Sequence, residues 1–263
     1  MRRVCLEHCD CLIVWNWIGQ MNEGLTNAEI AEPQQCIVKT MKVAAIVPAH
    51  NEARRIRPVL EALASAPEVD EVIMVSDGST DDTCTVAASV PGVTALELKR
   101  NKGKGGAMRH GALSTDADVL IFFDADLVGL NQQHIHDLLG PVLNGEATMA
   151  LGIFQGGRWA TDIAQYYSPG ITGQRALLKE VFLQIPDVEH VGYGIELAIT
   201  YYVRHHGMVS KYVPLRGITA TMKEEKLGWI CGSWSRCIMY WEMLRFRVSY
   251  ELHGRPPKKR TKK

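Results

Sequence analysis

The stretch Val119-Leu-Ile-Phe-Phe-Asp-Ala-Asp126 joins five apolar residues directly to two carboxylates. An unbroken apolar run of this kind predicts a β-strand that is buried on both faces, as in a parallel sheet. The two acids then stand at the carboxyl end of that strand, where open α/β sheets bind their ligands. This stretch therefore predicts both the class of the fold and the place of its functional site.

Similar apolar runs alternate with helical segments along the chain. The other runs are Val43–Val47, Val72–Val75, Val93–Leu98 and Thr148–Leu151. The helical segments are Arg55–Ser65, Asp82–Ser89, Gly105–Leu113, Gln132–Leu143 and Ile195–His206. Strands that alternate with helices of this length favour an α/β fold with a mostly parallel central sheet flanked by helices.

We expect one main domain with an extension at each end. Residues 1–40 hold four of the seven cysteines and show no clear period, so they form an N-terminal extension unless Met41 is the natural start. The main domain would span residues 41–250 and end in a C-terminal helical segment near Trp234–Val248. Residues 251–263 form a basic tail that should be disordered.

Composition excludes some classes of function. The formal net charge is zero, so no global basic excess indicates nucleic-acid binding. No apolar run reaches the ~18 residues of a membrane span. Seven irregularly spaced cysteines argue against a disulfide framework and favour a reducing, cytoplasmic setting. The aromatic and Arg-rich segment Trp229–Phe246 predicts either packing on the core or in a homodimer, or peripheral contact with an anionic membrane.

Polar residues follow three of the apolar runs. They are Pro48-Ala-His-Asn-Glu52, Ser76-Asp-Gly-Ser-Thr-Asp-Asp82 and Asp124-Ala-Asp126. Each segment alone also fits an ordinary turn or helix cap. All three at the same edge of one sheet favour a binding site over three unrelated turns.

Asp124 and Asp126 are the candidate metal ligands. Carboxylates at positions i and i+2 can approach one cation directly or through water. Their hard oxygen atoms suit Mg²⁺ or Mn²⁺, which would in turn bind a diphosphate. The alternative is a solvated turn.

The segment Lys102-Gly-Lys-Gly-Gly106 opens a predicted helix. Glycines let the backbone approach a ligand closely, and a helix N-terminus favours anions. Lys104 could therefore reach a phosphate, although a flexible basic turn has the same composition. The segment lacks the Gly-Lys-Ser or Gly-Lys-Thr of a P-loop.

Together these motifs resemble the signature of family 2 glycosyltransferases with the GT-A fold. The order and spacing of Pro48–Glu52, Asp77–Asp82, Gly103–Gly105 and Asp124–Leu127 agree with that family. Further on, Ser168–Arg175 and Gly192–Glu196 resemble the acceptor side of a subgroup that includes glucosyl-3-phosphoglycerate synthases.

The resemblance implies a glycosyltransferase, and among these a hexosyltransferase, that uses a nucleotide-sugar donor and a divalent metal ion. Asp77 would pair with the base, uracil in the first instance. Asp126, with Asp124 beside it, would hold Mg²⁺ or Mn²⁺. The residues implied to bind the nucleotide sugar are Pro48, Ala49, Asn51, Glu52, Asp77, Gly78, Lys104, Gly105, Asp124 and Ala125. Those implied to border the acceptor, a small molecule or a lipid-linked one, are Gly173, Gln174, Arg175 and Tyr193.

Glu196 and Asp126 are the candidate catalytic residues. Glu196 would take the acceptor's proton in an inverting enzyme or orient groups in a retaining one. Its plainer interpretation is an acid in the first turn of a helix, where it stabilises the helix dipole. The segment Gly217–Lys223 holds no histidine at the place where many such enzymes have a third metal ligand. Metal binding would therefore be weaker, or water and substrate would complete the metal site.

Two other functions remain open. A nucleotidyltransferase also uses an α/β sheet, a Gly-rich basic loop and carboxylate-bound Mg²⁺, but usually places that loop directly after the first strand. Here that place holds Pro48–Glu52. A non-catalytic sugar-nucleotide-binding protein would bind UDP without turnover, and the missing histidine permits it.

Overall fold

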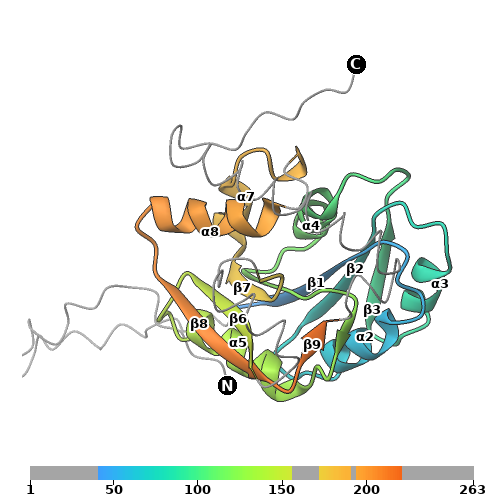
Figure 1. Ribbon diagram of the computed structural model, residues 1–263, viewed down its shortest axis with the longest axis horizontal. Coiled ribbons are helices and arrows are strands. Elements are labelled where there is room, and N and C mark those ends of the chain that lie inside the picture. Colours follow the sequence, from blue (N-terminus) through green and yellow to red (C-terminus); the bar gives the residue numbers. More distant parts are fainter. Residues whose placement is uncertain (1–40, 156–171, 191–193, 221–263) are drawn as a thin grey trace, which may run out of the picture. The chain divides into compact units, whose positions relative to one another are not determined.

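A seven-stranded sheet forms the centre of the computed structural model, which describes residues 41–155, 172–190 and 194–220 (Figure 1). Its strands are β1 (Val43–Ala49), β2 (Glu71–Ser76), β3 (Val93–Glu97), β4 (Val119–Phe122), β6 (Met149–Gln155), β7 (Arg175–Leu178) and β8 (Ser210–Arg216). They lie in the order β3-β2-β1-β4-β7-β6-β8. A second, two-stranded sheet pairs β5 (Leu127–Val128) with β9 (Thr219–Ala220).

Most of the central sheet is parallel. Strand β1 pairs in parallel with β2 and β4, β2 pairs in parallel with β3, and β6 with β8. Strand β7 is antiparallel to both of its neighbours, β4 and β6. The predicted α/β fold with a mostly parallel sheet is confirmed, and the antiparallel β7 is an addition to it.

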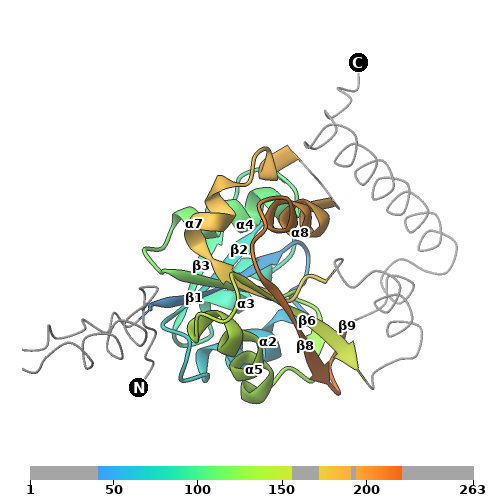
Figure 2. The same cartoon turned by 90° about the vertical axis from the view of Figure 1, so that its left-hand side faces the viewer.

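Helices cover both faces of the sheet, as Figures 1 and 2 show from two directions. One face carries α4 (Lys104–Leu113), α7 (Lys179–Gln184) and α8 (Ile195–His205). The opposite face carries α2 (Ile56–Ala64), α3 (Thr83–Ala88) and α5 (Gln132–Leu143). The helices predicted between the strands are therefore present, each within a few residues of its expected bounds.

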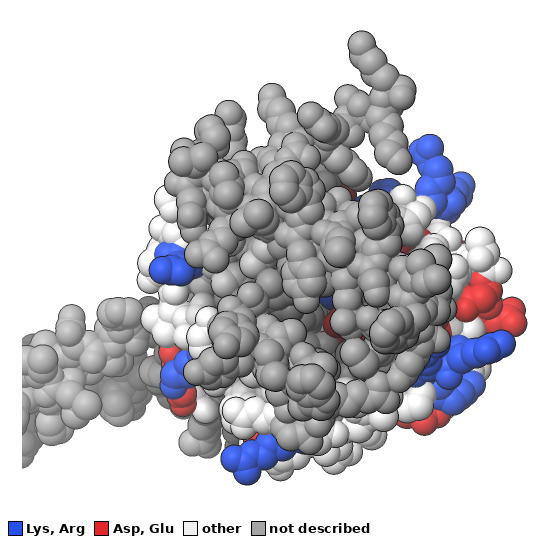
Figure 3. Space-filling model, in the orientation of Figure 1, with Lys and Arg blue, Asp and Glu red and all other residues white. Residues whose placement is uncertain are grey.

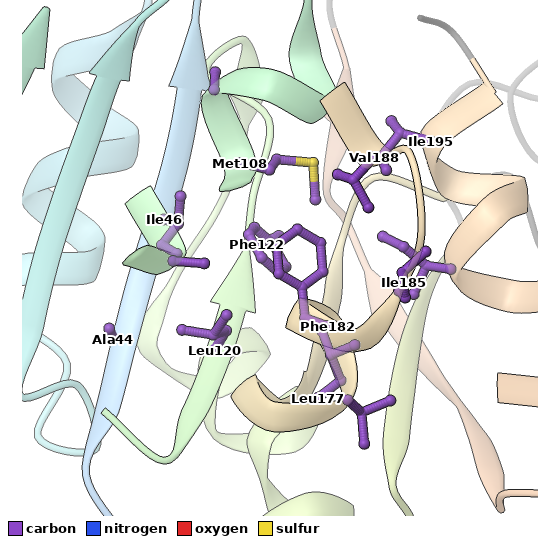
Figure 4. Close-up of a cluster of buried hydrophobic side chains, with 14 of the residues drawn as sticks. Ala44, Ile46, Met108, Leu120, Phe122, Leu177, Phe182, Ile185, Val188 and Ile195 are labelled. Carbon is purple, nitrogen blue, oxygen red and sulfur yellow. The ribbon is translucent and has the colours of Figure 1, made fainter. Parts of the chain in front are cut away.

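The core on the α4 side shows why the strands are apolar throughout. Ile46 and Phe122 point from neighbouring strands toward Met108 of α4 and Phe182 of α7, and all four are almost fully buried (Figure 4). The rings of Phe122 and Phe182 lie 5.0 Å apart in a tilted arrangement, which aromatic pairs prefer. Alternate residues of the same strands are buried under α2 and α5, so both faces need apolar side chains.

Helix α4 approaches the 3₁₀ helix η1 (Val188–His190) so closely that Gly105 has no room for a side chain. A Cβ atom at Gly105 would overlap the carbonyl oxygen of Val188. An ion pair closes the same contact, since Arg109 Nε lies 3.2 Å from Glu189 Oε1. The glycine therefore brings the segment before α8 against the first turn of α4.

We expect Gly105→Ala to lower the thermal unfolding temperature, because the added methyl group must push backbone apart, at a cost of about 1–3 kcal/mol. Gly140 in α5 is the matched control, since a Cβ atom there would meet nothing within 4 Å apart from its neighbours in the chain. Gly140→Ala should change stability little, because the gain in helix propensity is opposed by contact of the new Cβ atom with the ring of Pro141. Calorimetry of both variants checks this; a Gly105→Ala protein as stable as Gly140→Ala would contradict the close contact.

Several predicted features lie outside the described residues. These are the extension 1–40, Tyr193, the helix at 234–248 and the basic tail 251–263. The described residues all fall in the compact unit that begins at Met41. Within them, none of the helices has the length and hydropathy to cross a bilayer. On the face drawn in Figure 3, acidic and basic side chains of these residues are visible at the right, left and lower edges.

Candidate active site

Three loops and one helix start meet at the carboxyl edge of the sheet. Because β1, β2 and β4 are parallel neighbours, the residues that follow them emerge at the same edge. Strand β3 is parallel to β2, so α4, which follows it, begins at this edge as well. The structure thus brings four residues to the same edge of the sheet, as the sequence predicts: Asn51, Asp77, Lys104 and Asp124.

Side-chain hydrogen bonds tie the loop after β1 to the loop after β2. The Asn51 side-chain oxygen accepts a hydrogen bond from the backbone N–H of Thr80 at 2.8 Å, and Asn51 N donates to Ser79 Oγ at 3.1 Å. Next to it, Glu52 N donates to Thr83 Oγ1 at 2.9 Å. Asn51 has a φ of 57°, a conformation that asparagine tolerates better than most residues. These contacts give Asn51 and Glu52 a part in shaping the loop.

Asp77 fixes the loop that precedes α4. Only 4% of its surface is exposed, and its two carboxylate oxygens accept hydrogen bonds from Lys102 N at 2.7 Å and Gly103 N at 2.9 Å. The loop also passes close to Gly78, where a Cβ atom would lie 2.7 Å from Asn101 N. Each carboxylate oxygen of Asp77 can accept one more hydrogen bond, so these contacts leave acceptor positions for a uracil base. Contact between Asp77 and uracil stays a prediction.

Lys104 joins two carboxylates that are far apart in sequence. Its Nζ atom lies 2.5 Å from Asp124 Oδ1 and 2.7 Å from Glu196 Oε1. The exposed fractions of these side chains are 29% for Lys104, 28% for Asp124 and 12% for Glu196. The first residue of α4, the end of β4 and the first turn of α8 therefore meet in one partly buried charge cluster.

The segment before β7 contacts the carboxylate oxygen of Asp124 that does not face Lys104. Gln174 Nε2 donates to Asp124 Oδ2 at 3.0 Å, and the Thr172 hydroxyl donates to Gln174 Oε1 at 2.9 Å. Gly173 leaves room for this carboxylate, because a Cβ atom there would overlap it. Gly173 and Gln174, which are predicted to border the acceptor, thus lie against Asp124, which is predicted to bind the donor.

Electrostatics keep this cluster charged. Burial opposes the charged form of Lys104, but the charges of Asp124 and Glu196 outweigh it and raise the pKa of Lys104. Burial likewise opposes ionisation of Asp124, and the attraction of Lys104 outweighs it and lowers the pKa of Asp124. Burial lowers the pKa of Arg175 to about 10 against the pull of Glu196 and Asp124. All three groups are therefore charged at neutral pH.

Asp124 and Asp126 present the donor atoms that suit a hard cation. Asp126 is half-buried in the turn that leads from β4 to β5, with the buried Ala125 between the two acids. Among the described residues, no three His, Cys, Asp or Glu side chains form a group that could hold a metal. Two carboxylates fit Mg²⁺ or Mn²⁺, which commonly keep water and phosphate oxygens as their remaining ligands.

The remaining predicted residues, Pro48, Ala49 and Arg175, lie within strands of the sheet. Pro48 and Ala49 are the last residues of β1, where they pair with Val75 and Ser76. Arg175 is fully buried, with none of its surface exposed to solvent. The sequence analysis gave no role to Thr172, and a threonine two residues before a glutamine carries no signal that would have singled it out.

The family model of "Glycosyl transferase family 2" matches residues 44–195, which is more than half of the chain. The glucosyl-3-phosphoglycerate synthase of Mycobacterium tuberculosis is 30% identical over 121 residues, which cover 43% of this chain and 37% of that protein. The dolichyl-phosphate beta-glucosyltransferase of Drosophila melanogaster is 40% identical over 102 residues, which cover 33% of this chain and 31% of that one. The matched part thus spans about a third of the length of these relatives.

The fold also matches solved structures. A crystal structure of the Mycobacterium tuberculosis glucosyl-3-phosphoglycerate synthase with Mn²⁺, UDP and glucosyl-3-phosphoglycerate has a TM-score of 0.65 to this chain at 21% identity. The alignment covers 83% of this chain and 82% of that one. A second crystal structure of the same synthase, with Mn²⁺, UDP-glucose and glycerol 3-phosphate, gives a TM-score of 0.64. At this level of identity the likeness establishes the fold.

Proposed function

Because the chain belongs to glycosyl transferase family 2, we propose that it transfers a hexosyl group from a UDP-sugar to an acceptor, assisted by Mg²⁺ or Mn²⁺. The observation that carries the proposal is the meeting of Lys104, Asp124 and Glu196 within 2.7 Å at the carboxyl edge of the sheet. Charged groups of both signs at this edge suit a ligand that combines a metal ion with a diphosphate.

Each part of the site has a task in this reaction. Asp126 and Asp124 would hold the metal ion, which neutralises charge on the departing nucleoside diphosphate when it is bound. Asp77 holds the Lys102–Gly103 backbone in place for the nucleotide. Glu196, which shares Lys104 with Asp124, would either take the acceptor's proton or orient the acceptor.

The named relatives narrow the choice of donor and acceptor. One relative is a glucosyl-3-phosphoglycerate synthase and the other a dolichyl-phosphate beta-glucosyltransferase, so both names include a glucosyl group, and the synthase was crystallised with UDP-glucose. Their acceptors, phosphoglycerate and dolichyl phosphate, share a phosphate group although one is a small molecule and the other a lipid. We therefore propose UDP-glucose as the donor and a phosphate-bearing molecule as the acceptor.

A turnover assay tests the proposal. The protein is incubated with UDP-glucose and Mn²⁺ or Mg²⁺, and UDP release is measured without acceptor, with 3-phosphoglycerate, and with a polyprenyl phosphate in detergent. We expect slow hydrolysis alone and faster UDP release with one of the two acceptors. Metal-dependent UDP binding with no turnover on any donor would instead support a sugar-nucleotide-binding protein. Release of pyrophosphate from a nucleoside triphosphate would support a nucleotidyltransferase.

A further inference from the structure

Arg175 occupies an unusual place for a charged residue. It is the first residue of β7, in the middle of the sheet, where it lies opposite Phe122 of β4 and Leu151 of β6. None of its surface is exposed, so burial has removed its guanidinium group from water. A buried charge is costly unless hydrogen bonds and opposite charges compensate it, so its partners indicate what it does.

The guanidinium group of Arg175 bonds to the backbone of two different segments. Its Nη1 donates to the carbonyl oxygen of Glu196 at 3.0 Å, and its Nη2 donates to the carbonyl oxygen of Thr172. Glu196 lies in the first turn of α8, and Thr172 precedes β7. The planar fork of an arginine can hold two acceptors in a fixed geometry, which a lysine cannot do.

From these contacts we infer that Arg175 is a positioning residue, which holds the first turn of α8 so that the Glu196 carboxylate meets Lys104. The inference rests on the proposed function and replaces the contact with acceptor that the family resemblance implies for Arg175.

Kinetics separate the two roles of Arg175. Hydrolysis of UDP-glucose needs no acceptor, so loss of an acceptor contact would leave hydrolysis unchanged and raise only the KM of the acceptor. Loss of positioning should instead lower kcat about 100-fold in both hydrolysis and transfer, with the acceptor KM nearly unchanged, as for a reacting group misplaced by about 1 Å. We expect this second pattern for Arg175→Met, and a partial recovery of kcat for Arg175→Lys, which restores the charge without the fork.

A measurement that is independent of turnover keeps the inference testable if the protein does not turn over UDP-glucose. Hydrogen exchange of the α8 amides, including that of Thr200, should be faster in Arg175→Met and Arg175→Lys than in the unsubstituted protein. Lys179→Met is the matched control, because Lys179 follows β7 at its other end and also donates to a backbone carbonyl, that of Thr115. It should leave α8 exchange and kcat unchanged.

The outcomes distinguish failure of this inference from failure of the proposed function. Unchanged α8 exchange in both Arg175 variants, or a raised acceptor KM with normal hydrolysis, would overturn the positioning role. Absence of turnover in the unsubstituted protein, together with faster α8 exchange in the variants, would refute the transferase and leave the anchoring of Glu196 intact. If Arg175→Met does not fold, Arg175→Lys carries both measurements.

Discussion

Asp126→Ala is expected to lower kcat for UDP-glucose turnover about 1,000-fold and to remove the dependence of UDP binding on Mn²⁺. The physical reason is the loss of a metal ligand, since stabilisation of a leaving diphosphate by a bound metal is worth several kcal/mol, and each 1.36 kcal/mol is a factor of ten in rate. Thermal unfolding of the variant is measured alongside, so that a loss of the metal ligand can be separated from a loss of fold stability. UDP release and calorimetric titration of UDP with and without Mn²⁺ measure the two effects.

Asp116→Ala is the control for this substitution. Asp116 is an acid whose side chain is 83% exposed and pairs with Lys42, just before the amino end of β1. Its removal should leave turnover and metal dependence unchanged. Metal-dependent turnover that survives in Asp126→Ala would contradict the role assigned to Asp126, whatever the control shows.

Lys104→Met is expected to lower both stability and activity. It leaves Asp124 and Glu196 as two partly buried carboxylates without the cation that lies 2.5 and 2.7 Å from them. Removing one partner of a buried ion pair costs 3–5 kcal/mol, and the partial exposure of this cluster puts the loss near the lower end, about 3 kcal/mol. For a domain of this size that corresponds to a fall of roughly 6–12 °C in Tm.

The stability loss in Lys104→Met should depend on pH. The pKa of Asp124 is lowered on folding, so its ion pair contributes stability above its unfolded pKa of about 3.9 and loses it as the pH falls through the folded value. The pKa of Lys104 is raised, so its contribution is complete below an unfolded pKa of about 10.4. The difference in Tm between the two proteins should therefore be largest between about pH 5 and 9 and shrink below about pH 4.

Lys42→Met is the control for the charge change. Lys42 also bridges two carboxylates, Glu71 at 2.5 Å and Asp116 at 2.6 Å, but its side chain is 37% exposed and it precedes β1 at the opposite edge of the sheet. Its loss should lower Tm less than Lys104→Met does and leave activity unchanged. Equal effects of the two substitutions on turnover would contradict a specific role for the Lys104 cluster.

Much of the fold follows from patterns that are local in the sequence. The run Val119–Phe123 has no polar residue because both faces of β4 are covered. The runs Val43–Val47 in β1 and Val72–Val75 in β2 are apolar for the same reason. The acids that follow β4 could be placed at the binding edge because carboxyl ends of parallel strands meet there. The parallel half of the sheet, and the meeting of these polar loops at one edge of it, were therefore predictable.

The rest depends on contacts that no local pattern records. Strand β7 is four residues long and begins with an arginine, so its sequence gives no sign that it runs antiparallel between β4 and β6. The pairing of Lys104 with Glu196 joins residues 92 positions apart, and only the folded chain brings them together. The family resemblance predicts that Arg175 borders the acceptor, yet its side chain is fully buried and donates to two backbone carbonyl oxygens.

A crystal structure of the protein with UDP and Mn²⁺ tests the central claim most directly. The claim is that the carboxyl ends of β1, β2 and β4 form one site for a nucleotide and its metal ion. We expect Mn²⁺ beside Asp126, with the diphosphate near Lys104 and the uracil ring near Asp77. Density for UDP at another surface, or a metal ion bound away from Asp124 and Asp126, would contradict the account.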